Sequence, residues 1–386
     1  MPRPRWVLWG LACALCAGSS PAGAQVPSPI TSELFPFPGS VRTAGSTASA
    51  AVALADRWLG DEPFDNPAVA PWRGAVLSPV LQRMSRQDLR AANRHFDEQG
   101  AFLDVAGGWM GNPIGNLGFA LYGYQPVLRR EENAFERGEL GAPVQPAVIQ
   151  SNSSARELRL GAGASAALGA LRLGLAGEWT HRDDHYEATE QSGSPEEGTR
   201  RVEFSGDGFG FQVGARFDSP ERNGQSAFAI GAQGRYVPEL SLDGDQDFDI
   251  LTGPEHHAIS ARREAGWEGG LSARYAVTPA FRVIAGAGGH TALAWHGFGV
   301  TSGEGFLWSG ALEYHDARDP WTVRFGLGRE AEDGVPELRA GVLGLGFGWR
   351  FEQSTLDVGV LRRSIDRGSS PTLFDDRVVA SFGFEF

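Results

Sequence analysis

The final ten residues, Arg377-Val378-Val379-Ala380-Ser381-Phe382-Gly383-Phe384-Glu385-Phe386, carry the pattern that decides the fold class. Successive side chains of a β-strand point to opposite faces of a sheet, so strict alternation of apolar and other residues predicts a strand with one apolar face. The alternating apolar positions in this stretch are Val378, Ala380, Phe382, Phe384 and Phe386.

The same alternation continues through the chain from about residue 76. Clear examples are 209–217, 228–232, 267–275, 321–327 and 343–351. Long stretches of period-two alternation predict an all-β chain.

The breaks between these stretches predict about 13 joins and therefore about 14 strands. Tight turns alternate with longer polar loops along the chain, and short turns at one end with longer loops at the other are typical of a transmembrane β-barrel. The predicted joins lie near 85–99, 111–113, 126–153, 165–168, 182–199, 218–224, 238–256, 277–280, 297–303, 316–320, 331–335, 352–354 and 364–375.

The two strand faces differ in a way that favours a membrane barrel over a soluble sandwich. The apolar face has tryptophans near strand ends, as an aromatic girdle would. The other face has Gly, Ser, Gln and a few charges, which suits a crowded, wet lumen. In lipid every backbone polar group must pair within the sheet, so the sheet has to close. The girdle candidates are Trp179, Trp267, Trp308, Trp321 and Trp349. The predicted lumen-facing charges are Arg159, Arg172, Glu178, Arg216, Arg235, Glu268, Arg274, Arg324 and Arg350.

These features predict a transmembrane, antiparallel, up-and-down β-barrel of about 14 strands over residues 76–386. The terminal Phe386 resembles the ending of bacterial outer-membrane barrels, whose last strand is read by the barrel-insertion machinery. The expected partners are therefore that machinery and outer-membrane lipid. The alternative is a secreted all-β repeat protein.

Residues 1–24 have the pattern of a signal peptide, which is removed from the mature protein and is not part of the predicted barrel. Arg3 and Arg5 are followed by the apolar run 6–16 and by the small residues 22–24. Together with the barrel prediction, this places the protein in the outer membrane of a Gram-negative bacterium.

Composition excludes several other classes of protein. The chain has 53 Gly in 386 residues without a Gly-x-y period, which excludes collagen. A mean hydropathy of −0.24 and no long apolar run after the signal peptide exclude a helical membrane protein. A net charge of −13 disfavours nucleic acid as a partner.

The segment ahead of the barrel carries a family resemblance. The stretches 41–50 and 53–56, which ends at Asp56, and then Asn66-Pro67-Ala68 resemble the start of the FadL/PorV-like outer-membrane proteins. The resemblance implies a 14-stranded barrel whose N-terminal segment, here residues 25–75, plugs the lumen as a hatch. A departure is Val69, where the family usually has Gly.

The residues support the plug independently of the resemblance. A barrel of about 14 strands encloses more space than its side chains fill. Residues 25–75 are rich in Pro, Ser and Ala, yet they carry several aromatic side chains that need a surface to contact. The alternative is a disordered periplasmic tail.

One acidic cluster has part of the pattern of a metal site. Asp243, Asp245, Asp247 and Asp249 begin like a Ca²⁺-binding loop, but Phe248 and the residues after it break that pattern. An acidic, solvated outer loop is the preferred interpretation, with these four residues as a weak Ca²⁺ candidate. No metal site and no cofactor are predicted.

The predicted function is passive uptake of small hydrophobic or amphipathic molecules, gated by the N-terminal hatch. One alternative is a non-transporting, PorV-like accessory or carrier barrel of a protein export system. The other is an outer-membrane enzyme, but the Gly-x-Ser-x-Gly nucleophile motif is absent from the sequence, so no catalytic residue and no enzymatic activity are predicted. Most of the lumen-facing charges are expected to brace the barrel and the hatch.

Overall fold

A computed structural model describes most of the chain after its N-terminal segment. The predictions for the signal peptide 1–24, for Asp56 and for Phe386 lie outside the described residues. The described residues are Leu59 and the ranges 65–68, 73–86, 97–109, 117–136, 148–191, 198–222, 225–250, 253–296, 301–302, 304–315, 320–333, 338–352, 354–367 and 370–385.

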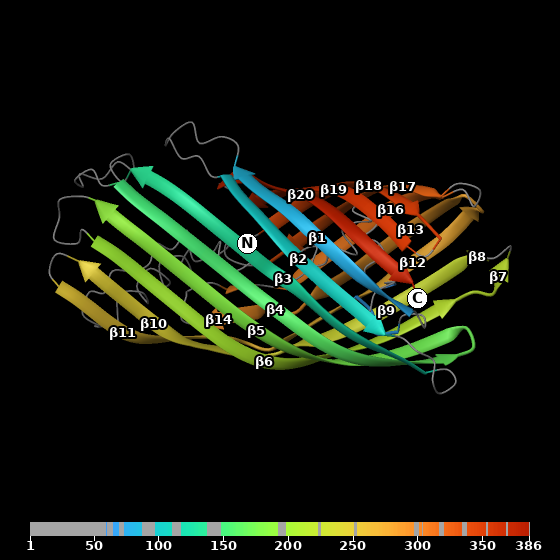
Figure 1. Cartoon of the computed structure of the whole chain (residues 1–386), viewed down its shortest axis with the longest axis horizontal. Coiled ribbons are helices and arrows are strands. Elements are labelled where there is room, and N and C mark those ends of the chain that lie inside the picture. Colours follow the sequence, from blue (N-terminus) through green and yellow to red (C-terminus); the bar gives the residue numbers. More distant parts are fainter. Residues whose placement is uncertain are drawn as a thin grey trace, which may run out of the picture.

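The regular structure of the described residues consists of β-strands (Figure 1). This part of the chain holds no apolar helix with the length to span a bilayer. The strands are β1 (Arg73–Arg86), β2 (Asp97–Trp109), β3 (Leu117–Glu136), β4 (Val148–Leu168), β5 (Leu171–Gln191), β6 (Gly198–Asp218), β7 (Glu221–Arg222), β8 (Gln225–Ser226), β9 (Phe228–Val237), β10 (Leu240–Ile250), β11 (Gly253–Arg263), β12 (Gly266–Thr278), β13 (Phe281–His290), β14 (Leu293–His296), β15 (Thr301–Ser302), β16 (Gly305–His315), β17 (Trp321–Glu332), β18 (Leu338–Arg350), β19 (Ser354–Arg367) and β20 (Ser370–Glu385).

The strand pairings form a ring. Neighbouring strands pair antiparallel from β1 through β6, β9, β12, β13 and β16 to β20. The last strand then pairs with the first, from Gly74 opposite Glu385 to Arg86 opposite Leu373. The sequence of pairings thus returns to β1, which is the closure that lipid requires of a sheet.

The main sheet has 18 strand segments, and four crossings of the wall are each divided into two of them. β9 and β10 both pair with β6, and their other neighbours are β12 and β11, so β9 and β10 are two parts of one crossing. The same holds for β11 with β12, for β13 with β14 and for β15 with β16. The ring therefore has 14 crossings, as the alternation predicted.

The distribution of polar and apolar side chains is the reverse of that in a soluble protein. On the outward face Leu175 is 57% exposed and Phe209 is 75% exposed. On the opposite face of the same sheet Glu178, Gln212 and Arg235 are buried. Apolar surface is stable in this position only against an apolar solvent, so the outward face is the lipid face of a transmembrane barrel.

Aromatic side chains mark both edges of the outward apolar band. Trp267, near the start of β12, contacts Tyr236 and Phe211 with ring centroids 5.4 and 5.6 Å apart. At the other end of the strands Tyr314 and Trp321 lie 5.4 Å apart. This arrangement matches the two girdles of a barrel that crosses a bilayer with roughly 9–11 residues per strand.

Five predicted joins are wrong, because strands occupy residues that were predicted to connect them. β4 contains the whole of 165–168, and β19 and β20 occupy most of 364–375. β3 and β4 extend far into the predicted join 126–153, and β5 and β6 extend into 182–199. The predicted loop 238–256 is occupied by β10 and the start of β11. The extended parts of β6 and β10 lie beyond the aromatic edge of the band, where the apolar side chains change face. Val202, Phe204, Leu242 and Phe248 are buried on the inward face, and the aspartates of β10 are exposed on the outward face. The outward apolar pattern therefore stops there although the strands continue. In Figure 1 these strands extend on one side of the barrel past the ends of the others.

The predicted start of the barrel is also corrected. β1 begins at Arg73, where the plug segment was predicted to continue to residue 75. Arg73 lies opposite Trp109 and Gly74 lies opposite Gly108, so the pairing with β2 includes these residues in the wall.

The lipid-facing band predicts a depth-dependent cost for a charge. Val213 lies in the middle of the band on β6, and Ser205 lies on the same face of β6 beyond the band. Val213→Arg should lower the free energy of unfolding by about 2–4 kcal/mol, whereas Ser205→Arg should change it by less than about 1 kcal/mol. Reversible urea unfolding in phospholipid vesicles measures both values. Equal effects would contradict the assignment of this face to lipid.

Candidate functional site

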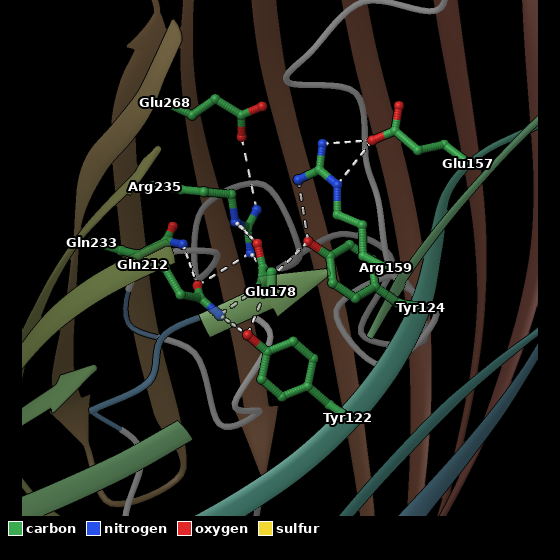
Figure 2. A network of polar contacts seen from close by, with 9 residues as sticks. All are labelled: Tyr122, Tyr124, Glu157, Arg159, Glu178, Gln212, Gln233, Arg235 and Glu268. Atoms are coloured by element: carbon green, nitrogen blue, oxygen red, sulfur yellow. Dashed lines mark hydrogen bonds and ion pairs between the residues drawn. The ribbon is translucent and has the colours of Figure 1, made fainter. Parts of the chain in front are cut away.

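A network of buried polar side chains lies on the inner face of the wall between β3 and β12 (Figure 2). The side chains come from six neighbouring crossings, and closure of the ring directs all of them inward. Its members in Figure 2 are Tyr122, Tyr124, Glu157, Arg159, Glu178, Gln212, Gln233, Arg235 and Glu268.

Glu178 on β5 accepts several of the hydrogen bonds in this network. Its Oε1 accepts the hydroxyls of Tyr122 and Tyr124 from β3, at 3.0 and 3.2 Å. The amide of Gln212 on β6 donates to the same oxygen at 3.4 Å and also to the Tyr122 hydroxyl. A buried carboxylate needs several donors of this kind to compensate for lost hydration.

Arg235 on β9 supplies the positive charge opposite Glu178. Its Nε lies 3.1 Å from Glu178 Oε2, and its Nη1 lies 3.7 Å from Glu268 Oε2 on β12. Its Nη2 donates to Gln212 Oε1 at 3.1 Å, and Gln233 donates to that same oxygen at 2.7 Å. The guanidinium therefore joins three strands of the wall.

Glu157 on β4 is surrounded by three arginines. Arg159 Nη2 and Arg263 Nη1 lie 2.7 and 3.0 Å from its two oxygens, and Arg182 Nη1 lies at 3.5 Å. Arg182 in turn pairs with Asp184 at 2.7 Å. All five groups are buried.

The charges of this region balance within the described residues. Four guanidiniums, of Arg159, Arg182, Arg235 and Arg263, face four carboxylates, of Glu157, Glu178, Asp184 and Glu268. Desolvated ions are tolerated when each has an opposite charge and further hydrogen bonds. These eight groups thus form a neutral, cross-linked network, whose clearest role is to brace this part of the barrel.

A second group of ions lies elsewhere on the ring. Glu313 on β16 binds Arg282 of β13 at 2.7 Å and Arg324 of β17 at 2.8 Å. Arg324 also pairs with Asp357 on β19. Each of these pairs joins different strands, as the pairs of Glu178 with Arg235 and of Glu157 with Arg263 do in the first network.

Of the predicted lumen-facing charges, the structure brings four into the first network and one into the second. Arg159, Glu178, Arg235 and Glu268 belong to the first, and Arg324 belongs to the second.

Arg172 and Arg216 form a separate pair of contacts, because both bind Asp218 Oδ2 at 3.0 Å. Arg274 shares the inward side of β12 with Glu268, and Arg350 lies exposed at the end of β18.

Several network residues were not predicted from the sequence. Arg182 and Asp184 fall in a region predicted as a loop, although they continue the even-numbered positions of Glu178 along β5. Tyr122 and Tyr124 alternate with apolar residues on β3, and a parity count along β3 would have placed them inward.

The described residues ahead of β1 lie against the inner wall. The Asn66 amide donates to the carbonyls of Ala215 on β6 and Ala232 on β9, at 3.4 and 3.3 Å. Its Oδ1 accepts the backbone N–H of Ala68 at 2.9 Å, which holds residues 66–68 in a turn. Arg216 donates to the Leu59 carbonyl at 3.4 Å. Leu59, Asn66 and Ala68 are fully buried.

Two glycines of the wall make room for this turn. A Cβ at Gly174 on β5 would overlap the backbone of Pro67, and one at Gly214 on β6 would overlap Asn66 Oδ1. The place where the 66–68 turn contacts the wall, called here its seat, therefore depends on the absence of side chains at two neighbouring inward positions, Gly174 and Gly214.

The predicted acidic loop is corrected to a strand. Asp243, Asp245, Asp247 and Asp249 project from one face of β10, on the outward side. His256 on β11 lies 2.7 Å from Asp247 and 3.4 Å from Asp245. The hydrogen bond to Asp247 raises the pKa of His256 above its ordinary value. Among the described residues, no group of three or more His, Cys, Asp or Glu is placed to hold a metal ion.

The ion pair of Glu178 predicts a large cost for neutralising this side chain. Glu178→Gln should lower the free energy of unfolding by about 3–5 kcal/mol, because it leaves the buried Arg235 without its nearest carboxylate. Glu187→Gln on the same strand is the matched control. It should cost at most about 1 kcal/mol, since Glu187 and its partner Arg201 are partly exposed. Urea unfolding in vesicles measures both, and a Glu178 variant as stable as the control would contradict the bracing role.

Comparison with known proteins gives structural matches only. No family model matches the chain, and no curated protein matches it. A Pseudomonas aeruginosa FadL homologue is 13% identical with a TM-score of 0.66, and the match covers 91% of this chain and 99% of that chain. The toluene transporter TbuX of Ralstonia pickettii is 12% identical with a TM-score of 0.56, over 84% of this chain and 92% of that chain. The toluene transporter TodX of Pseudomonas putida is 11% identical with a TM-score of 0.55, over 83% and 92%.

At sequence identities this low, structural similarity establishes the fold of the chain and not its ligand. The matches extend over most of both chains, so the likeness concerns the whole barrel. Together with the ring of 14 crossings and the inverted faces, they show that this chain has the fold of the FadL-like outer-membrane β-barrels.

Proposed function

We propose that this protein is an outer-membrane channel for passive uptake of small hydrophobic or amphipathic molecules, and that its N-terminal segment is the gate. The observation that carries the proposal is the seat of residues 66–68 on the inner wall at Gly174 and Gly214. The similar structures include proteins described as toluene transporters, which supports the ligand class.

A plug is needed because a ring of this size encloses more space than its own side chains fill. The Asn66 contacts anchor the segment to β6 and β9 by two hydrogen bonds and a tight steric fit. We propose that these contacts hold the turn at rest and that an entering ligand displaces it. The outer membrane has no ATP, and a displaceable plug suits passive flow.

Entry is proposed on the wall that extends beyond the lipid band. On its inward side β6 carries Val202 and Phe204, and β10 carries Leu242 and Phe248. These apolar side chains lie next to the ionic group around Glu157, since Asp184 is opposite Phe204 in the register of β5 and β6. Apolar and charged surfaces side by side suit an amphipathic ligand.

Exit is proposed between β2 and β3. Their described pairing comprises three residue pairs, from Val105 opposite Gly123 to Gly107 opposite Leu121. The register of β3 with β4 shifts between Tyr124 and Val127, where Pro126 lacks an N–H to donate. A seam whose described pairing is this short is the proposed place for a ligand to leave the lumen sideways.

Removal of the plug should open the barrel. A variant lacking residues 25–72, which keeps β1 intact, should conduct ions in planar bilayers, whereas the mature full-length chain should be nearly closed. Cells that produce the full-length chain should also take up labelled toluene faster than cells without it. If both forms are folded and inserted but silent, the barrel itself fills the lumen, and a non-transporting accessory role replaces uptake.

The seat of the turn offers a finer test of gating. Gly214→Val should displace Asn66 and produce frequent channel openings in planar bilayers, because the new side chain occupies the site of the Asn66 amide. Gly177→Val is the matched control on β5, where a Cβ meets no atom within 4 Å, and it should remain closed. A Gly214 variant that is as closed as the control would show that the 66–68 turn does not hold the gate.

A further inference from the structure

Two buried polar atoms on the inner wall, on the second and third crossings after β12 along the ring, lack hydrogen-bond partners among the described residues. They are Oγ of Ser309 on β16 and Oε1 of Glu330 on β17. The residues are 5% and 6% exposed. Buried polar atoms without partners are rare and costly, so each requires an explanation.

The strand register places the two side chains on one patch of the wall. Glu330 lies opposite Leu307, and Ser309 is the next inward residue after Leu307 on β16. Such diagonal neighbours lie within reach of a long side chain. One small group between them can therefore contact both atoms.

The surroundings of this patch combine apolar side chains with a second buried carboxylate. Glu332 is the next inward residue after Glu330 on β17, and its Oε2 lies 3.9 Å from Nε2 of His290. Leu307, Val342 and Ile284 are buried on the neighbouring inward positions of β16, β18 and β13. Arg363 on β19 donates to Oε2 of Glu330 through Nε at 2.7 Å and also through Nη2, which neutralises the carboxylate and leaves Oε1 free to accept.

The hydrogen-bonding needs of the patch define the ligand group. Oε1 of Glu330 is an acceptor only, whereas the hydroxyl of Ser309 can donate or accept. A ligand hydroxyl can donate to Glu330 and accept from Ser309, so one group satisfies both. A hydrocarbon satisfies neither, and a carboxylate would bring a second negative charge against Oε1. An ammonium would lose its hydration beside Glu330, whose own charge Arg363 already balances.

We propose that Ser309 and Glu330 form a subsite for the hydroxyl of a neutral, apolar ligand such as a phenol or an alcohol. This inference rests on the proposed uptake function and specifies its substrate class. Arg363 positions the Glu330 carboxylate, and Leu307, Val342 and Ile284 contact the apolar body.

The test compares two probes that differ by one hydroxyl, p-cresol and toluene. Their equilibrium binding is measured to the full-length protein in lipid nanodiscs, with protein-free nanodiscs as the correction for partition into lipid. The wild-type protein should bind p-cresol about tenfold more tightly than toluene, as expected for two hydrogen bonds to buried groups.

Substitutions of Ser309 locate the effect. Ser309→Ala should reduce the preference for p-cresol about threefold, whereas Ser309→Thr, which keeps the hydroxyl, should retain it. Ser165→Ala is the matched control, since Ser165 is a buried, inward-facing serine on β4, and it should leave the preference unchanged. Equal binding of the two probes, or a preference that Ser309→Ala does not alter, would overturn the subsite and leave ordered water as the partner of both atoms.

This outcome is separable from that of the proposed function, because binding in nanodiscs does not require passage. Uptake of labelled toluene with equal binding of both probes would overturn the hydroxyl subsite and leave the channel. Preferential p-cresol binding without conductance or uptake would overturn the channel and leave a ligand site in a non-transporting barrel.

Discussion

Closure of the sheet through the pairing of β1 with β20 is the constraint on which the rest of the structure depends. A strand edge in lipid would leave a row of backbone N–H and C=O groups without partners, at a cost of several kcal/mol each. The ring removes that edge and gives every strand one lipid face and one inner face. Inversion of polar and apolar side chains follows from it, as seen in the exposed Phe209 and the buried Gln212 of β6.

Closure also explains why so many charges can be buried. Inward side chains from neighbouring strands converge. Their positive and negative charges have to balance, because the interior hydrates them poorly. Glu178 with Arg235 and Glu157 with Arg263 are such pairs, each joining different strands. The same wall provides the rigid surface on which residues 66–68 rest. A flexible wall could not hold the close fit at Gly174 and Gly214.

Much of the fold could be predicted from local pattern, and much of the candidate site could not. Alternation predicted the strands within the lipid band, the inward direction of Glu178 and Arg235, and 14 crossings. It failed beyond the band, where β10 carries Asp243 to Asp249 on its outward face and was predicted as a loop. The apolar residues of a barrel strand face outward only where that face meets lipid. Beyond the aromatic edge the outward face meets water, so β10 carries its aspartates outward and Leu242 and Phe248 inward, and the apolar residues change face.

The sequence by itself determined the all-β class, the number of crossings and the face on which each side chain of the band lies, because a period of two is a local property of the chain. Only the tertiary structure decided which inward residues meet. Glu157 and Arg263 are 106 positions apart, and Asn66 reaches Ala232 across 166 positions. The orphaned oxygens of Ser309 and Glu330 are likewise evident only once the register of β16 and β17 is set. Register and closure set these distances, and neither is written in any single stretch of residues.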